Sequence, residues 1–147
     1  MKKKLSQKAD KYELYEEAVQ NVDFEVDFYQ KMFKKYSSRK AKDLREDFCA
    51  SAKISSKWVS ECEDHFAYAI DLDEKILKYA KKISQDDLTI NQTKRLRFIK
   101  ANSINYSSPK VDIVSACNFS YWVFKKRDQL IKYFKNSHRC LKKDGLF

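Results

Sequence analysis

Hydrophobic positions recur along this chain with two different periods, which predict helices alternating with short strands. In the first 40 residues apolar side chains follow helical spacing, as at Tyr12, Tyr15 and Val19. We expect a packing face there and a second helix capped by Asn21 or Asp23. Beyond this region the pattern predicts strands at 42–47, 65–71, 95–100 and 111–116, helices at 52–62, 74–83 and 125–141, a polar loop at 85–94, and the start of a fifth strand at 146–147.

This alternation of strands and helices is typical of an α/β fold with a doubly wound, mainly parallel, Rossmann-like sheet. We divide the chain into an N-terminal helical cap at 1–40 and a partial Rossmann-like domain at 41–147. Two residues of a fifth strand cannot complete the sheet, so we expect the fourth strand to form an exposed edge. Such an edge predicts self-association or a partner chain, and it is equally typical of a fragment.

The candidate chemistry lies where the first two expected strands end. Glu46 stands at the end of the first strand, a loop of mostly small residues follows at 48–51, and Asp71 closes the second strand. A Rossmann-like fold holds an adenosine-containing cofactor in this way, with the loop beneath the ligand and the second acid on the ribose hydroxyls. Glycine is usual in such a loop, but the single glycine of this chain is Gly145. If the backbone at Ala50 needs a positive φ, alanine costs about 1 kcal/mol or more there.

Three segments together resemble a bacterial group of class I S-adenosylmethionine-dependent methyltransferases. The group carries a Leu-Arg-Glu-Asp-Phe-Cys-Gly-Thr loop, a Val-Asp-Leu-Asp strand end and an Asn-Phe-Ser-Tyr-Trp segment, which this chain matches at 44–51, 70–73 and 118–122. The resemblance extends in order over residues 10–147. It implies a class I methyltransferase fold, S-adenosylmethionine as the cofactor, and methyl transfer to a small-molecule acceptor. The family continues with two further strands that this chain lacks.

The resemblance also implies which residues hold the cofactor. Glu46 matches the acid that holds the methionine end, Asp71 the acid that binds the ribose, and Asn102 the position that contacts adenine. Asp73 is the expected helix cap, which leaves Asp71 for the ligand. At Ala50 the chain departs from the group, which has glycine there. The implied cofactor-binding residues are Glu46, Phe48, Cys49, Ala50, Asp71, Leu72, Asn102, Ser103 and Asn118.

Asn118 and Tyr121 are the implied catalytic residues. Their segment has the spacing of the Asn-Pro-Pro-Tyr motif of amino-methyltransferases, in which carbonyl oxygens accept from the target NH2 group and the aromatic ring stacks on a planar substrate. Phe-Ser replaces Pro-Pro here, so a nucleobase target is only one alternative. The other is an aromatic pocket wall of Phe119, Tyr121 and Trp122, with Asn118 near the sulfonium, which aromatic faces attract.

Composition narrows the remaining classes of function. The formal net charge is +10, but 25 of the 31 basic residues are lysines, spread along the chain among 21 acids, which favours a solvated surface over a nucleic-acid site. The four cysteines form no CxxC pair and neither histidine has a second ligand at zinc spacing, so we expect no metal site and reduced, cytoplasmic thiols. We expect no signal peptide and no membrane contact, since no run approaches the roughly 20 apolar residues of a membrane span.

Our leading interpretation is a methyltransferase that uses S-adenosylmethionine, or the cofactor-binding portion of one. A second interpretation, motivated by Ala50 and the early end of the sheet, is an inactive relative that acts as a binding module. A third is a basic nucleic-acid-binding protein that uses Lys125, Lys126 and Arg127 beside Trp122. The sequence does not identify the methyl acceptor.

Overall fold

The computed structural model describes residues 14, 18 and 21–147, and the elements follow the expected alternation. The packing face expected at Tyr12, Tyr15 and Val19 lies outside the described residues. The helices are α2 (Val22–Tyr36), α3 (Lys53–Glu61), α4 (Glu74–Asp87), α5 (Ile90–Thr93) and α6 (Arg127–Cys140), with a 3-10 turn, η2 (Ser120–Val123). The strands are β1 (Asp43–Asp47), β2 (Phe66–Asp71), β3 (Leu96–Lys100), β4 (Val111–Ser115) and β5 (Leu141–Leu146).

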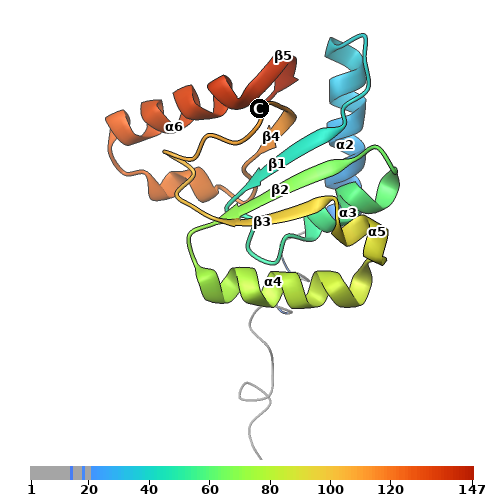
Figure 1. The fold of residues 1–147 in the computed structure, drawn as a ribbon. Coiled ribbons are helices and arrows are strands. Elements are labelled where there is room, and N and C mark those ends of the chain that lie inside the picture. The colour runs from blue at the N-terminus through green and yellow to red at the C-terminus, as the bar shows by residue number, and fades with distance from the viewer. Residues whose placement is uncertain (1–13, 15–17, 19–20) are drawn as a thin grey trace, which may run out of the picture.

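All five strands form one parallel sheet in the order β3-β2-β1-β4-β5 (Figure 1), which confirms the predicted Rossmann-like fold class. β1 pairs with β2 at Leu44 and Ala67, and with β4 at Leu44 and Ile113. The order therefore reverses at β1, with β2 and β3 on one side and β4 and β5 on the other. In open α/β sheets ligands bind at such a switch point, outside the carboxyl ends of the strands.

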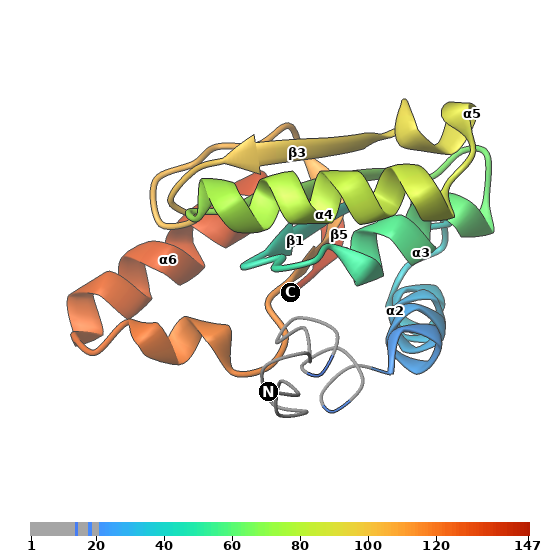
Figure 2. The same ribbon diagram turned by 90° about the horizontal axis from the view of Figure 1, so that it is seen from below.

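Helices cover both faces of the sheet. Figure 1 shows α4 and α6 on opposite sides of the strands, and Figure 2 shows α3 and α4 lying across one face. Phe33 of α2, Trp58 of α3 and Ala80 of α4 belong to one buried cluster with Leu44 of β1. Helix α2 thus shares its core with the sheet, and the division into a cap and a domain at residue 40 stays a prediction.

Two predicted helix caps are confirmed. The Asn21 side chain accepts from the backbone N–H of Phe24 at the start of α2. The Asp73 carboxylate accepts from the backbone N–H of Lys75 at 2.8 Å and begins α4. Each side chain satisfies a backbone donor that has no partner within the helix.

The polar loop predicted at 85–94 is wrong, because helix occupies most of it. α4 continues to Asp87, and its buried Ser84 hydroxyl bonds to the Ser56 hydroxyl of α3 at 2.9 Å. The short helix α5 follows, closed by a capping box between Thr89 and Gln92. Contact with α3 and a local cap outweigh the polar composition from which the loop was predicted.

The fifth strand also differs from the prediction. It begins at Leu141, directly after α6, and pairs with β4 at Val111 and Ile113 through an irregular register. Lys142, which lies between the predicted helix and the predicted strand, belongs to β5 and forms ion pairs with Asp43 and Asp112. β4 is therefore covered, and the expectation that it forms the exposed edge is wrong. On this side of the sheet the edge strand is β5, which lies next to β4.

No helix among the described residues combines the length and apolar character that crossing a membrane requires.

Asp112, at the start of β4, joins three parts of the chain. Its buried carboxylate accepts from the backbone N–H groups of Lys42 at 2.7 Å and Asp43 at 2.9 Å, and pairs with Arg39 and Lys142. Burial alone would raise the pKa of Asp112, but these hydrogen bonds and cations hold it below its ordinary value. The carboxylate thus favours folding in its ionised form.

We expect Asp112→Asn to destabilise the protein by about 2 kcal/mol at pH 7, because charge-assisted hydrogen bonds are lost. The lowered folded pKa means that the wild-type advantage is present above pH about 4 and disappears as the pH falls through the lower folded value. Urea unfolding at pH 7 and pH 3 measures both effects, and the gap between the two proteins should narrow at pH 3.

The matched control is Asp27→Asn, whose exposed carboxylate pairs with Lys31 on the surface of α2. We expect it to change the free energy of unfolding by less than about 0.5 kcal/mol. An equal loss in both variants would contradict the special role of Asp112.

Candidate functional site

The loop between β1 and α3 has an unusual backbone. φ is 57° at Phe48, 46° at Ala50 and 56° at Ala52, so all three lie in the left-handed region although none is glycine. Each such residue costs roughly 1–2 kcal/mol relative to a right-handed conformation. Ala50 therefore has the positive φ for which the sequence analysis predicts an energetic cost of alanine.

Neighbouring strands hold this loop in place. The backbone N–H of Cys49 donates to the carbonyl oxygen of Ile70 at 3.0 Å, and that of Ala50 donates to the Asp71 carboxylate at 3.2 Å. The Phe48 ring packs against the rings of Phe124 and Tyr133, with both centroid separations at 5.8 Å. Tertiary contacts thus impose the conformation that glycine usually permits.

Glu46 faces α3 and takes over the cap of that helix. The N-cap residue, Ala52, has no side chain that can accept a hydrogen bond, and Glu46 Oε2 accepts instead from the backbone N–H of Ser55 at 2.9 Å and from its hydroxyl. Burial raises the pKa of Glu46 to about 7, against the lowering effect of both Ser55 hydrogen bonds. One oxygen of the predicted methionine-end acid is thus committed to α3.

Asp71 joins the first loop to the next one. Its Oδ2 accepts from the N–H of Ala50 and its Oδ1 accepts from the N–H of Asp73 at 2.9 Å, which fixes the orientation of the carboxylate. The side chain stays half-buried at the carboxyl end of β2 and retains lone pairs for further donors. Leu72 beside it is exposed.

The two cofactor-binding residues predicted in the loop after β3, Asn102 and Ser103, differ in their exposure. Asn102 is exposed, and its Oδ1 accepts from the backbone N–H of Ile104 at 3.0 Å. Ser103 is buried, and its carbonyl oxygen accepts from Arg45 and Asn136. Asn102 is thus accessible to a ligand at the carboxyl edge, while Ser103 belongs to the packing beneath α6.

The aromatic segment after β4 is tightly turned. φ is 57° at Asn118 and 54° at Phe119, and η2 follows. The Tyr121 ring packs on Phe134 of α6 at a centroid separation of 5.9 Å. Phe119 and Trp122 pack on each other at 5.0 Å and remain 67% and 62% exposed. The open aromatic surface is therefore formed by Phe119 and Trp122 rather than by the predicted catalytic Tyr121.

Sequence reasoning missed a contact between α2 and the end of β4. The Tyr29 hydroxyl lies 2.6 Å from Ser115 Oγ and 2.8 Å from Cys117 Sγ. Desolvation is the main cause that raises the pKa of Tyr29, so its hydroxyl stays protonated. Tyr29 and Phe28 line an apolar cavity of about 410 Å³ that reaches Ser115 and Cys117. Helical spacing predicts packing residues in the first 40 residues but gives no signal for a hydroxyl contact of this kind.

Two buried polar atoms of the described residues have no hydrogen-bond partner: Glu25 Oε2 and Ser51 Oγ. Ser51 is 4% exposed and lies in the left-handed loop. Burial raises the pKa of Glu25, whose charge in turn raises the pKa values of Glu46 and Cys117. An unsatisfied buried polar group costs about 1–3 kcal/mol, so each of these two atoms would gain from a polar partner supplied by a ligand.

Cys49 is buried, and desolvation raises the pKa of its thiol well above the ordinary value, so the structure gives it no nucleophilic character. Over the described ranges, no group of three or more histidines, cysteines or acids is placed to hold a metal ion.

We expect Ala50→Gly to stabilise the protein by about 1 kcal/mol, because glycine adopts the left-handed conformation without strain. Urea unfolding measures the change. The matched control, Ala80→Gly in the interior of α4, should instead destabilise by about 1 kcal/mol or more. Loss of stability in both variants would show that Ala50 is not strained.

We also expect Glu46 to make stability depend on pH. Because its folded pKa lies above the unfolded value, the folded state binds more protons between pH about 4.5 and about 7, and stability falls as the pH rises through this window. Glu46→Gln should remove this fall, which amounts to at most about 3 kcal/mol. Urea unfolding at pH 5 and 8 measures it, with Glu61→Gln at the end of α3, the helix that Glu46 caps, as the control. Parallel pH profiles of wild type and Glu46→Gln would refute the assignment.

Comparison with known proteins agrees with this geometry. The methyltransferase domain family matches residues 47–147. No curated protein matches the chain. A methyltransferase from Clostridium acetobutylicum that depends on S-adenosylmethionine has a TM-score of 0.74 and 20% identity over 90% of this chain and 52% of its own. The sugar N-methyltransferase KedS8 from a Streptoalloteichus species has a TM-score of 0.73 and 15% identity, over 99% of this chain and 54% of its own. The glycopeptide N-methyltransferase MtfA, complexed with S-adenosylmethionine, has a TM-score of 0.65 and 10% identity, over 82% of this chain and 53% of its own. The chain thus spans about half the length of these structures, and the likeness establishes the shared fold.

Proposed function

Because this chain belongs to the methyltransferase domain family, we propose that it forms the cofactor-binding part of an enzyme that transfers a methyl group from S-adenosylmethionine to a small-molecule acceptor. The observation that carries the proposal is the loop after β1, which keeps a left-handed backbone at three positions without glycine. Strain of this kind persists where the surrounding structure over-determines it, and it clusters at ligand sites.

The residues around the switch point fit the cofactor. Glu25 and Glu46 would offer carboxylates to the ammonium group of its methionine end, and Ser51 has a hydroxyl without a partner. The oriented carboxylate of Asp71 would accept from the ribose hydroxyls, and the exposed Asn102 would contact adenine. When bound, the cofactor supplies an electrophilic methyl group on a sulfonium. The loop residues Phe48, Cys49, Ala50 and Leu72 complete the proposed binding set.

The acceptor would lie near the end of β4. Asn118 follows this strand, and Phe119 and Trp122 present exposed rings beside it. The catalytic role of Asn118 and Tyr121 stays a prediction, with Asn118 as a carbonyl that positions the acceptor and Tyr121 as part of the aromatic wall. The similar structures include a sugar N-methyltransferase and a glycopeptide N-methyltransferase, which supports a small-molecule acceptor.

The left-handed Ala50 favours a second candidate, a relative with weakened cofactor binding that acts as an interaction module. Thermal unfolding with excess S-adenosylhomocysteine separates the two functions. Ligand at 100 times its dissociation constant adds roughly 2.7 kcal/mol to the free energy of unfolding. A cooperative melt without any upward shift would support the second candidate.

We expect Asp71→Ala to weaken S-adenosylhomocysteine binding about 100-fold, because two charge-assisted hydrogen bonds to the ribose are lost. Asp71→Asn, which keeps an acceptor for the loop, should fall between this variant and wild type. Isothermal titration calorimetry measures the affinity and circular dichroism confirms the fold. The control is Asp86→Ala on the exposed side of α4. Unchanged affinity in folded Asp71→Ala would overturn the assignment.

A further inference from the structure

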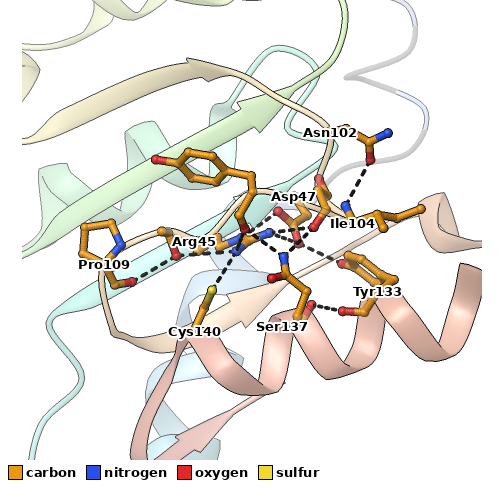
Figure 3. A network of polar contacts seen from close by, with 12 residues as sticks. Arg45, Asp47, Asn102, Ile104, Pro109, Tyr133, Ser137 and Cys140 are labelled. Atoms are coloured by element: carbon orange, nitrogen blue, oxygen red, sulfur yellow. Dashed lines mark hydrogen bonds and ion pairs between the residues drawn. The ribbon is translucent and has the colours of Figure 1, made fainter.

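Two buried side chains, Arg45 and Asn136, hold the loop after β3 through the same two acceptors. Figure 3 shows Arg45 within this network of polar contacts, between the strands and α6. Arg45 donates to the carbonyl oxygens of Ser103 at 3.2 Å and Tyr106 at 3.0 Å. Asn136 Nδ2 donates to the same two oxygens, at 2.8 Å each. Each carbonyl oxygen has two lone pairs, so both of these acceptors are fully used.

The two donors are themselves fixed in place. Arg45 is completely buried and forms a bidentate pair with Asp47, at 2.8 and 3.2 Å. The Tyr133 hydroxyl of α6 donates to the same carboxylate at 2.9 Å. Asn136 lies one turn further along α6 and is also buried. The loop is therefore tied to a rigid unit made from β1 and α6.

The tied loop presents Asn102 to the carboxyl edge of the sheet. Its Oδ1 is engaged with the backbone N–H of Ile104, and its backbone carbonyl oxygen accepts from the N–H groups of Asn105 and Tyr106. The side chain is exposed while its own loop is locked beneath it. A locked loop with one exposed amide discriminates between ligands better than a mobile one, because a mobile loop adapts to either.

We propose that Arg45 and Asn136 are positioning residues that give the site its selectivity for a 6-aminopurine. This inference rests on the proposed function, since it assigns the base of the cofactor to the loop at 102–106. Neither residue touches the ligand. They act by fixing two carbonyl groups, so that Asn102 meets the base in one geometry.

The test uses Asn136→Leu, which keeps the size of the side chain and removes both donors while Arg45 still holds the loop. Calorimetry gives the affinities for S-adenosylhomocysteine and for S-inosylhomocysteine, which differs in the purine alone. We expect the ratio of the two affinities to fall at least about fivefold in the variant. Hydrogen exchange at 101–107 should accelerate at the same time.

The matched control is Ser137→Ala, one residue along α6, whose hydroxyl donates within the helix to the carbonyl oxygen of Tyr133 at 3.1 Å and not to the loop carbonyls that Asn136 holds. It should keep the wild-type ratio and the wild-type exchange. Asn136→Ser serves as a second variant if Asn136→Leu does not fold. Thermal unfolding identifies the folded variants before binding is measured.

The outcomes separate this inference from the proposed function. A wild-type protein that binds neither ligand overturns the proposed function, and this inference with it. A wild type that prefers the adenosine ligand, together with an Asn136 variant of equal preference, overturns only the positioning role. Equal weakening for both ligands also overturns it, because this would indicate general destabilisation.

Discussion

The buried ion pair between Arg45 and Asp47 is the interaction on which the rest of the structure depends. A fully buried guanidinium is costly unless its donors are satisfied, and here they reach Asp47, two loop carbonyls and the sulfur of Cys140. Through these bonds a single side chain of β1 joins the central strand, the loop after β3 and the end of α6.

The alternation of side chains along β1 explains how one short strand serves two layers. Leu44 and Glu46 face α2, α3 and α4, where Leu44 enters the apolar core and Glu46 caps α3. Arg45 and Asp47 face α6 and form the buried pair. The charged residues of this motif therefore serve different faces of the sheet. A shift of one residue in register would move each of these side chains to the opposite face.

The sequence allowed strands β1 to β4 and the caps at Asn21 and Asp73 to be predicted, because period and capping chemistry are local properties. It misplaced β5, since the Lys142 contacts that fasten this strand join residues far apart in the chain. The site shows the same division. Asp71 was predicted from its place at a strand end, whereas no local pattern indicated the contacts of the Tyr29 hydroxyl or the Asn136 amide. Which polar atom of a packing residue meets a partner depends on the tertiary structure.

The loop at 48–52 shows why the lack of glycine does not exclude a ligand loop. Glycine makes a left-handed backbone inexpensive, but this fold reaches the same backbone by other means. The Phe48 ring packs against both Phe124 and Tyr133, and the backbone N–H groups of Cys49 and Ala50 are held by β2. Because Tyr133 also bonds to Asp47, the conformation of the loop depends on the same ion pair that positions the loop after β3. The two loops that would enclose an adenosine-containing ligand are thus fixed by one buried network.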